Sequence, residues 1–197
     1  MITACRKCRR ASEKLLLKGE KCLSPNCSLT KRPYAPGQHG QSFRGKISEY
    51  GRQLAEKQKA RCIYNVLEAQ FAGYVKKADT MQGNKSENLL KLLESRIDNV
   101  IFRLGFAPSR SAARQYVSHE FFNLNGHKVK TASLQVKPGD VIEIRKKDYF
   151  KEVKLNSAIT WIDVDSKKMK AEIKHLPTRE EIDTNINESL IIEFYSR

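Results

Sequence analysis

Apolar residues recur at helical spacing through the first half of the chain and give way to alternation in the second. Over 48–77 they are mixed with basic residues, and Ser48 is placed to cap the first turn. This pattern predicts two helices or one long bent helix, which Gly83 ends. A second apolar stripe, from Leu89 to Leu104, predicts a helix that ends at Gly105.

The later pattern changes to short strands and turns. Ser109 can cap a further helix, and Asn125-Gly126 between short alternating segments is a strong hairpin signal. The turn at 137–140 precedes a strand at 141–144, and segments 161–165 and 169–173 fit a hairpin that turns at 166–168. The sequence therefore predicts an α+β chain in which two helices pack on a small antiparallel sheet.

Segment 31–41 separates these elements from the N-terminus and contains two prolines and two glycines, which predict a turn-rich linker. The linker is basic and carries Tyr34 and His39, a composition suited to lying along an RNA backbone. His39 could instead be a metal ligand.

Composition adds a strong positive charge. The 197 residues contain 37 Lys and Arg against 22 Asp and Glu, a net charge of +15, which fits one or two domains and favours a nucleic-acid partner. The longest apolar runs are too short to span a bilayer, and the first residues show no apolar signal core. We expect an intracellular protein with no membrane contact.

The charge is uneven along the chain. Residues 1–61 hold 15 cations against 4 acids, a net +11, while 151–197 hold 8 against 9. A basic terminal segment can simply be solvated and bind nothing, but this one also carries cysteines at regular spacing.

Two closely spaced cysteine pairs lie in the basic segment. A spacer of two to four residues lets both sulfurs of a pair face one tetrahedral ion at about 2.3 Å, so we expect Cys5, Cys8, Cys22 and Cys27 to bind a metal. Zinc is the default ion, and an iron–sulfur cluster would suit the same four thiolates. Two disulfides or buried free thiols are the alternatives, and disulfides fit poorly without a secretion signal.

Four arginines share one predicted helix face in the middle of the chain. Arg96 and Arg103 are seven residues apart, and Arg110 and Arg114 are four apart. A strip of unmatched arginines predicts phosphate binding that follows the shape of an RNA helix, and a solvated helix face is the alternative.

Further candidate RNA-binding residues are basic or aromatic neighbours of the cysteines, of the linker, of the first long helix and of the hairpin. They are Arg6, Lys7, Arg9, Arg10, Lys21, Lys31, Arg32, His39, Arg44, Lys46, Arg52, Lys57, Arg61 and Lys128.

Several motifs resemble a known family. Segments 96–100, 104–106 and 109–115, with Asn125-Gly126 and Gly139-Asp140, resemble the small RNA-binding module of ribosomal protein S4. The module also occurs in RNA-modifying enzymes. Segments 32–40, 48–51, 53–59, 177–180 and 193–197, with the cysteine pairs, are similar to the bacterial small-subunit protein and extend the resemblance over nearly the whole chain.

The resemblance implies an inserted module in a helical domain. The expected parts are a four-cysteine metal knuckle with basic linker (1–46), a helical domain (47–91), the RNA-binding module and further hairpin (92–176), and a C-terminal tail that returns to the helical domain (177–197). The acidic residues of that tail predict a surface that faces protein.

The same resemblance implies a function. Family members bind 16S rRNA early in assembly of the 5′ domain, contact ribosomal protein S5 and other small-subunit proteins, influence decoding accuracy, lie where mRNA enters, and in many cases repress their own operon. We therefore expect a cytoplasmic ribosomal constituent that forms no homo-oligomer.

Enzyme signatures are missing from the sequence. It contains no phosphate loop and no nucleophile elbow, and its four histidines are scattered. An RNA-modifying enzyme would need a separate catalytic domain, for which no segment is left. A regulatory mRNA binder that acts off the ribosome would present the same basic surface.

Overall fold

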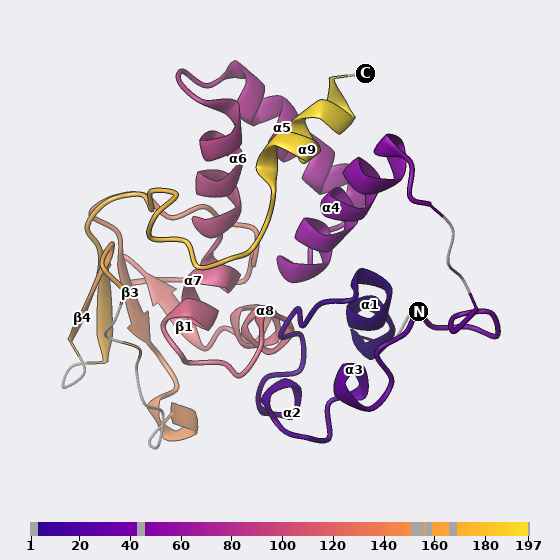
Figure 1. Ribbon diagram of the computed structural model, residues 1–197. Helices are drawn as coiled ribbons and strands as arrows, with labels where there is room; N and C mark the ends of the chain where they lie inside the picture. The colour runs from indigo at the N-terminus through magenta and orange to yellow at the C-terminus, as the bar shows by residue number, and fades with distance from the viewer. Residues whose placement is uncertain (1–3, 43–45, 151–155, 157–158, 166–168, 197) are drawn as a thin grey trace. The chain divides into compact units, whose positions relative to one another are not determined.

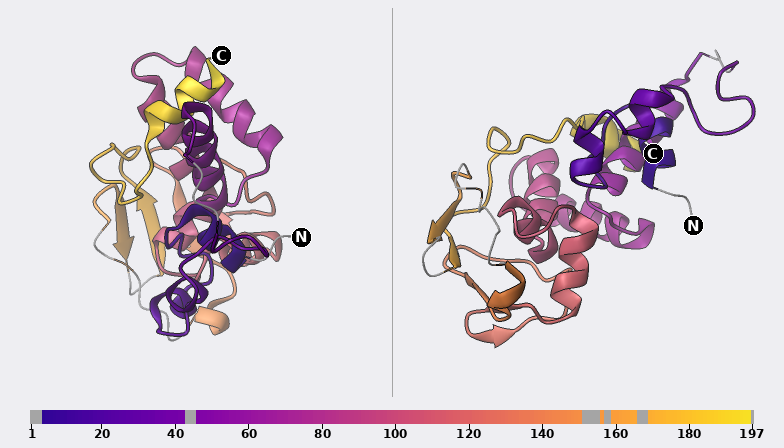
Figure 2. Two further views of the ribbon diagram at one scale, coloured as in Figure 1. Left: turned by 45° about the vertical axis from the view of Figure 1, so that its right-hand side comes forward. Right: turned by 90° about the horizontal axis from the view of Figure 1, so that it is seen from below.

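The computed structural model describes residues 4–42, 46–150, 156, 159–165 and 169–196. These form two compact units (Figures 1 and 2): unit 1 contains Met1–Val75 and Asn185–Arg197, and unit 2 contains Lys76–Thr184. The first division precedes the expected boundary after residue 91, and the second follows the expected boundary after residue 176, because residues 76–91 and 177–184 belong to unit 2. No helix among the described residues is long and apolar enough to cross a membrane.

The described part of unit 1 combines helices with turns and loops and contains no strand. Its helices are α1 (Ala4–Ala11), α2 (Glu20–Leu23), α3 (Ser28–Lys31), α4 (Glu49–Ile63), most of α5 (Glu68–Thr80) and α9 (Glu188–Tyr195). Ser48 caps α4 as predicted, with its hydroxyl accepting from the backbone N–H of Gly51. The two-helix alternative for 48–77 is confirmed, since the chain bends at Asn65, whose φ is +52°.

The C-terminal helix α9 lies alongside α4 (Figure 1). Asn187 caps it by accepting from the backbone N–H of Leu190. Ile191 is buried in the contact, and the rings of Tyr50 and Phe194 meet with their centroids 5.6 Å apart. The last segment of the chain thus completes a core begun by residues far ahead of it in sequence.

In its described residues, unit 2 combines the end of α5 and three further α-helices with a five-stranded sheet. The helices are α6 (Lys85–Glu94), α7 (Ile97–Arg103) and α8 (Arg110–Ser118), and the strands are β1 (Phe122–Leu124), β2 (His127–Lys128), β3 (Val141–Ile144), β4 (Ile162–Asp165) and β5 (Lys170–Ile173). A short 3₁₀ helix, η1 (Lys147–Phe150), follows β3. The strand order is β2-β1-β3-β5-β4, with every pairing antiparallel.

One apolar cluster joins the helices α7 and α8 to the sheet. Leu104 and Val117 from the helices are buried with Phe122, Ile142 and Trp161 from the sheet side. The predicted α+β class, with two helices on a small antiparallel sheet, is confirmed.

The predicted turns of unit 2 are confirmed where they are described. Asn125 and Gly126 have φ of +50° and +80°, the left-handed pair that a tight hairpin needs, and they join β1 to β2. Asp140 closes the turn at 137–140 by accepting from the backbone N–H of Lys137 at 2.7 Å. Strands β4 and β5 form the second hairpin, whose predicted turn at 166–168 lies outside the described residues.

The single helix expected over the stripe from Leu89 to Leu104 is wrong. The chain leaves the helix at Ser95 and Arg96, where backbone groups bond to a distant loop: Val136 donates to Ser95 at 2.8 Å, and Ile97 donates to Leu134 at 2.8 Å. The helix splits into α6 and α7 because these long-range bonds replace the helical ones.

Candidate nucleic-acid interface and cysteine cluster

The four predicted cysteine ligands lie on three short helices of unit 1. Cys5 and Cys8 are one turn apart on α1, Cys22 lies in α2, and Cys27 directly precedes α3. All four are free thiols, and all except Cys5 are buried. The four thiols thus come from three successive short helices, and none of them forms a disulfide.

The thiols influence one another and are held by backbone groups. Burial raises the pKa of Cys8, a hydrogen bond from the backbone of Leu15 opposes this, and the other three cysteines raise the pKa further. The backbone of Leu29 lowers the pKa of Cys27.

The donor set fits a thiolate metal centre in its chemistry. The backbone N–H of Lys18 donates to Sγ of Cys22 at 3.3 Å, and four cysteine sulfurs are a donor set that zinc and iron–sulfur clusters accept. Within the described residues, however, no group of three or more Cys, His, Asp and Glu side chains is arranged to hold an ion. The zinc or iron–sulfur centre stays a prediction.

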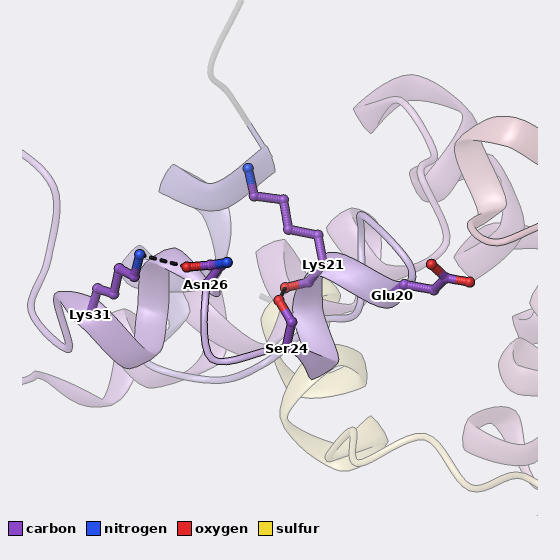
Figure 3. A pocket seen from close by; sticks show the side chains of 5 residues that line it. All are labelled: Glu20, Lys21, Ser24, Asn26 and Lys31. Carbon is purple, nitrogen blue, oxygen red and sulfur yellow. Dashed lines mark hydrogen bonds between the residues drawn. The ribbon is translucent and has the colours of Figure 1, made fainter.

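Cations near the cysteines are mostly exposed. The exposed members of the predicted set in this region and the linker are Arg6, Arg10, Lys21, Lys31, Arg32 and Lys46. Lys21 and Lys31 line an open pocket with Glu20, Ser24 and Asn26, in which Lys31 donates to the Asn26 side chain at 2.8 Å (Figure 3). This face presents several positive charges to solvent.

Arg9 has a positioning role instead. Its guanidinium donates to the backbone oxygens of Tyr34 and Ala35, at 2.9 and 3.2 Å, and lies 4.8 Å from the centroid of the Tyr34 ring. It therefore ties the start of the linker to α1. Lys7, also on α1, is half-buried.

The linker is turned and exposed, as predicted. A Cβ at Gly40 would lie 1.9 Å from the carbonyl oxygen of Ala35, so only glycine fits that close approach. His39 is exposed. The predicted residue Arg44 lies outside the described residues.

Lys57 was expected to bind RNA, which requires an exposed side chain, but the structure buries it. Its side chain is only 7% exposed and donates to Glu68 at 2.7 Å, while its ammonium lies 4.4 Å from the centroid of the Phe194 ring. Tyr195 also donates to Glu68, at 3.0 Å. Lys57 is buried because α9 covers it, so it stabilises the packing of α9 and has no surface for a phosphate.

The charges around Glu68 shift its pKa and that of its partner. Burial alone would raise the pKa of Glu68, but the hydrogen bonds from Lys57 and Tyr195 and the charge of Arg61 lower it. Burial and the bond to Glu68 raise the pKa of Tyr195. Arg61 pairs with the same carboxylate at 3.0 Å and is partly exposed, whereas Arg52 is exposed and pairs with Glu49.

Arg96 is not on an outer helix face. It directly precedes α7 and is completely buried, and its guanidinium donates to both carboxylate oxygens of Asp98, at 3.1 and 2.7 Å. The predicted surface position is therefore wrong. The helix break described above turns the side chain inward, toward an acid two residues along.

Arg103 and Arg110 are also engaged within unit 2. Arg103 bonds to the buried carboxylate of Glu94 at 2.8 and 3.0 Å and pairs with Asp183. Burial would lower the pKa of Arg103, but these two acids raise it. Arg110 donates to Asn99 at 2.7 Å and stacks over the Phe102 ring at 4.4 Å.

The arginine strip is thus not a row of exposed charges. Arg114, the fourth member, is half-buried, while Lys128 on β2 is exposed. Asn99 links Arg110 to the Arg103–Glu94 ion pair, because its side-chain amide donates to Glu94 at 2.6 Å while its carbonyl oxygen accepts from Arg110. The predicted strip is largely an internal network that joins α6, α7 and α8.

Comparison with known proteins agrees with this architecture. The family described as ribosomal protein S4/S9 N-terminal domain matches residues 3–94, and the S4 domain matches residues 95–142. The chain is 52% identical over 98% of its length to small ribosomal subunit protein uS4 of Heliobacterium modesticaldum, covering 96% of that protein. It is 51% identical to uS4 of Syntrophomonas wolfei and of Clostridioides difficile, covering 97% of each and 99% and 98% of this chain.

The chain belongs to the uS4 family. The resemblance predicted from the motifs is therefore confirmed. Members of the uS4 family are ribosomal proteins of the cytoplasm and not enzymes, so the predicted location and the absence of catalysis follow from membership.

One set of exposed residues in unit 2 was not predicted from the sequence. His119, Lys130, Arg145, Lys146 and Tyr149 are exposed in unit 2, around the end of α8 and the end of β3. The run of cations that starts at Arg145 is the signal that the sequence offers for this set. Helical spacing does not single it out, because the run follows a strand.

Proposed function

We propose that this chain is a structural constituent of the small ribosomal subunit that binds 16S rRNA. The observation that supports this most directly is its similarity, over nearly its whole length, to proteins named for the small ribosomal subunit. The S4 domain at 95–142 and the excess of cations agree with an RNA ligand.

The main phosphate-binding surface is assigned to unit 1. The exposed cations of α1, the short helices and the linker carry no carboxylate partner within the part of the chain that the structure describes. Cations of this kind release counterions from RNA when they bind phosphates, so they supply affinity with little sequence preference.

In unit 2 the arginines act indirectly. Arg96 and Arg103 hold α7 through Asp98 and Glu94, and so fix the surface that the module presents. Direct RNA contacts are assigned to exposed cations such as Lys128. Binding at a helical junction would then follow RNA shape, as expected of a small module without base-reading groups in a groove.

Finer roles follow from the family resemblance. We propose that binding nucleates assembly of the 5′ domain, that the protein contacts ribosomal protein S5 and lies where mRNA enters, and that it contributes to decoding accuracy and represses its own operon. The exposed acids Glu180 and Glu193 support a tail that faces protein and repels RNA.

A bound metal is proposed for the cysteines. Cys5, Cys8, Cys22 and Cys27 would hold Zn²⁺ or an iron–sulfur cluster, which would supply the cross-link that three short helices with little core of their own lack. The lowered pKa of Cys27, caused first by its hydrogen bond to the backbone of Leu29, supports a thiolate at that position.

Sedimentation tests the proposed function. The tagged chain should travel with the small-subunit peak at moderate salt, and the purified chain should bind a transcript of the 16S 5′ domain. An off-ribosome regulator would stay at the top of the gradient, and that result with no transcript binding would refute the proposal.

A further inference from the structure

An exposed tyrosine follows β3 in unit 2, on η1, which is orange in Figure 1. Tyr149 is 71% exposed, whereas its neighbour Phe150 is 2% exposed and belongs to the core. Single exposed apolar residues are common on protein surfaces, so exposure alone assigns nothing. The surroundings of Tyr149 are what distinguish it.

Tyr149 is the outer member of a stack of three rings. Its centroid lies 4.9 Å from that of Phe121 at an interplanar angle of 35°, and Phe121 lies 5.4 Å from Tyr116 at 9°. Phe150 meets both inner rings edge-on, at 85° to Tyr116 and 82° to Phe121. The core therefore fixes the inner rings, and the tilted ring of Tyr149 packs on Phe121 while most of its own surface stays exposed.

Three cations lie against Phe121 and its neighbour Glu120, beside the inner rings. The ammonium of Lys146 lies 4.4 Å from the Phe121 centroid and donates to the backbone oxygen of His119 at 3.3 Å. Arg145 and Lys130 both pair with Glu120, at 3.0 and 2.9 Å. Glu120 thus pairs with two cations, and with Lys146 these described side chains carry three positive charges against one carboxylate, a net charge of +2.

We infer that Tyr149 stacks on an unpaired base of single-stranded RNA, while Lys146 and Arg145 hold the flanking phosphates. An open aromatic face next to cations is how proteins bind single strands, because every base has a face that can stack. The inference rests on the proposed function for its RNA ligand and adds a contact that duplex binding would not use. An acidic protein segment is the competing occupant.

The test uses the full chain and two short RNA strands of equal charge, one with adenine bases and one with abasic sugars. The wild-type chain should bind the base-bearing strand about tenfold more tightly. Tyr149→Ala should abolish this preference, and Tyr149→Phe should keep it. The salt dependence should not change in either variant, because no charge is removed.

Leu134→Ala serves as a matched control, since Leu134 is an exposed apolar residue of the same unit, at 40%. It should keep the preference. Fluorescence of Trp161, buried at 2% in the core of unit 2, should be unchanged in all variants and reports that they fold.

Two results would overturn the inference: equal binding of both strands by the wild-type chain, or a preference that Tyr149→Ala retains. Either result would favour an acidic protein segment as the occupant of this surface. Binding to the 16S 5′ domain transcript is measured in parallel. If that binding is intact while the base preference is missing, only this inference fails; if it is missing, the proposed function fails.

Discussion

Replacement of Arg96 by alanine separates a structural role from an RNA-binding role. The guanidinium is fully buried and bonds to both oxygens of Asp98, whose side chain is 4% exposed. The variant leaves a carboxylate buried without this partner. Breaking a buried pair in this way costs about 3–5 kcal/mol.

The expected shift can be worked out for urea unfolding. A loss of about 4 kcal/mol divided by a slope of about 2 kcal/mol per M lowers the midpoint by about 2 M. Trp161 is the sole tryptophan and is buried in unit 2, so its fluorescence reports this unit alone. Under conditions where the variant is folded, the salt slope of rRNA binding should equal that of the wild-type chain.

Lys128→Ala is the matched control. Lys128 is an exposed cation of the same unit, so its loss should leave the midpoint unchanged and reduce the salt slope by about 0.7–0.9 if it contacts one phosphate. The reasoning is refuted if Arg96→Ala shows the behaviour assigned to Lys128→Ala, with unchanged stability and a smaller slope.

Three further predictions concern other parts of the molecule. A strong chelator should collapse the amide spectrum of residues 1–30 and leave the remainder folded, and an unchanged spectrum there would refute the metal proposal. Tyr195→Phe should lower the free energy of unfolding of unit 1 by about 1 kcal/mol, because it removes the bond to Glu68, and unchanged urea unfolding would contradict this. Bonds to Thr160, Thr178 and His175 outweigh burial and lower the pKa of Glu181 to about 2. Since the folded-state pKa is depressed, the stabilisation is present above pH of about 4.5 and is lost as the pH falls toward 2; Glu181→Gln should flatten this part of the thermal stability profile.

Local signals were read correctly from the sequence because their physics is local. Ser48 and Ser109 cap helices through a hydroxyl and an amide three residues apart, and Asn125-Gly126 adopts its turn because of its own backbone preferences. Each of these depends on neighbours that the sequence places side by side. The same holds for family recognition, which used motifs in their order along the chain.

The roles of several cations could not be read in this way. Lys57 is buried by α9, a helix more than a hundred residues later, and Arg96 turns inward because Ser95 and Ile97 bond to the loop at 134–136. Spacing along a helix cannot reveal a helix break that is caused by a distant segment. Periodicity therefore predicted an arginine face where the fold has an ion-pair network.

This correction changes where the RNA-binding charge lies. Arg96 and Arg103 are compensated by Asp98, Glu94 and Asp183, so they add little to the field outside unit 2. The exposed cations of α1, the short helices and the linker have no such compensation among the residues that the structure describes. If binding energy follows uncompensated charge, most of the salt dependence of rRNA binding comes from the N-terminal segment. Unit 2 then contributes mainly its shape and the contacts of its exposed cations.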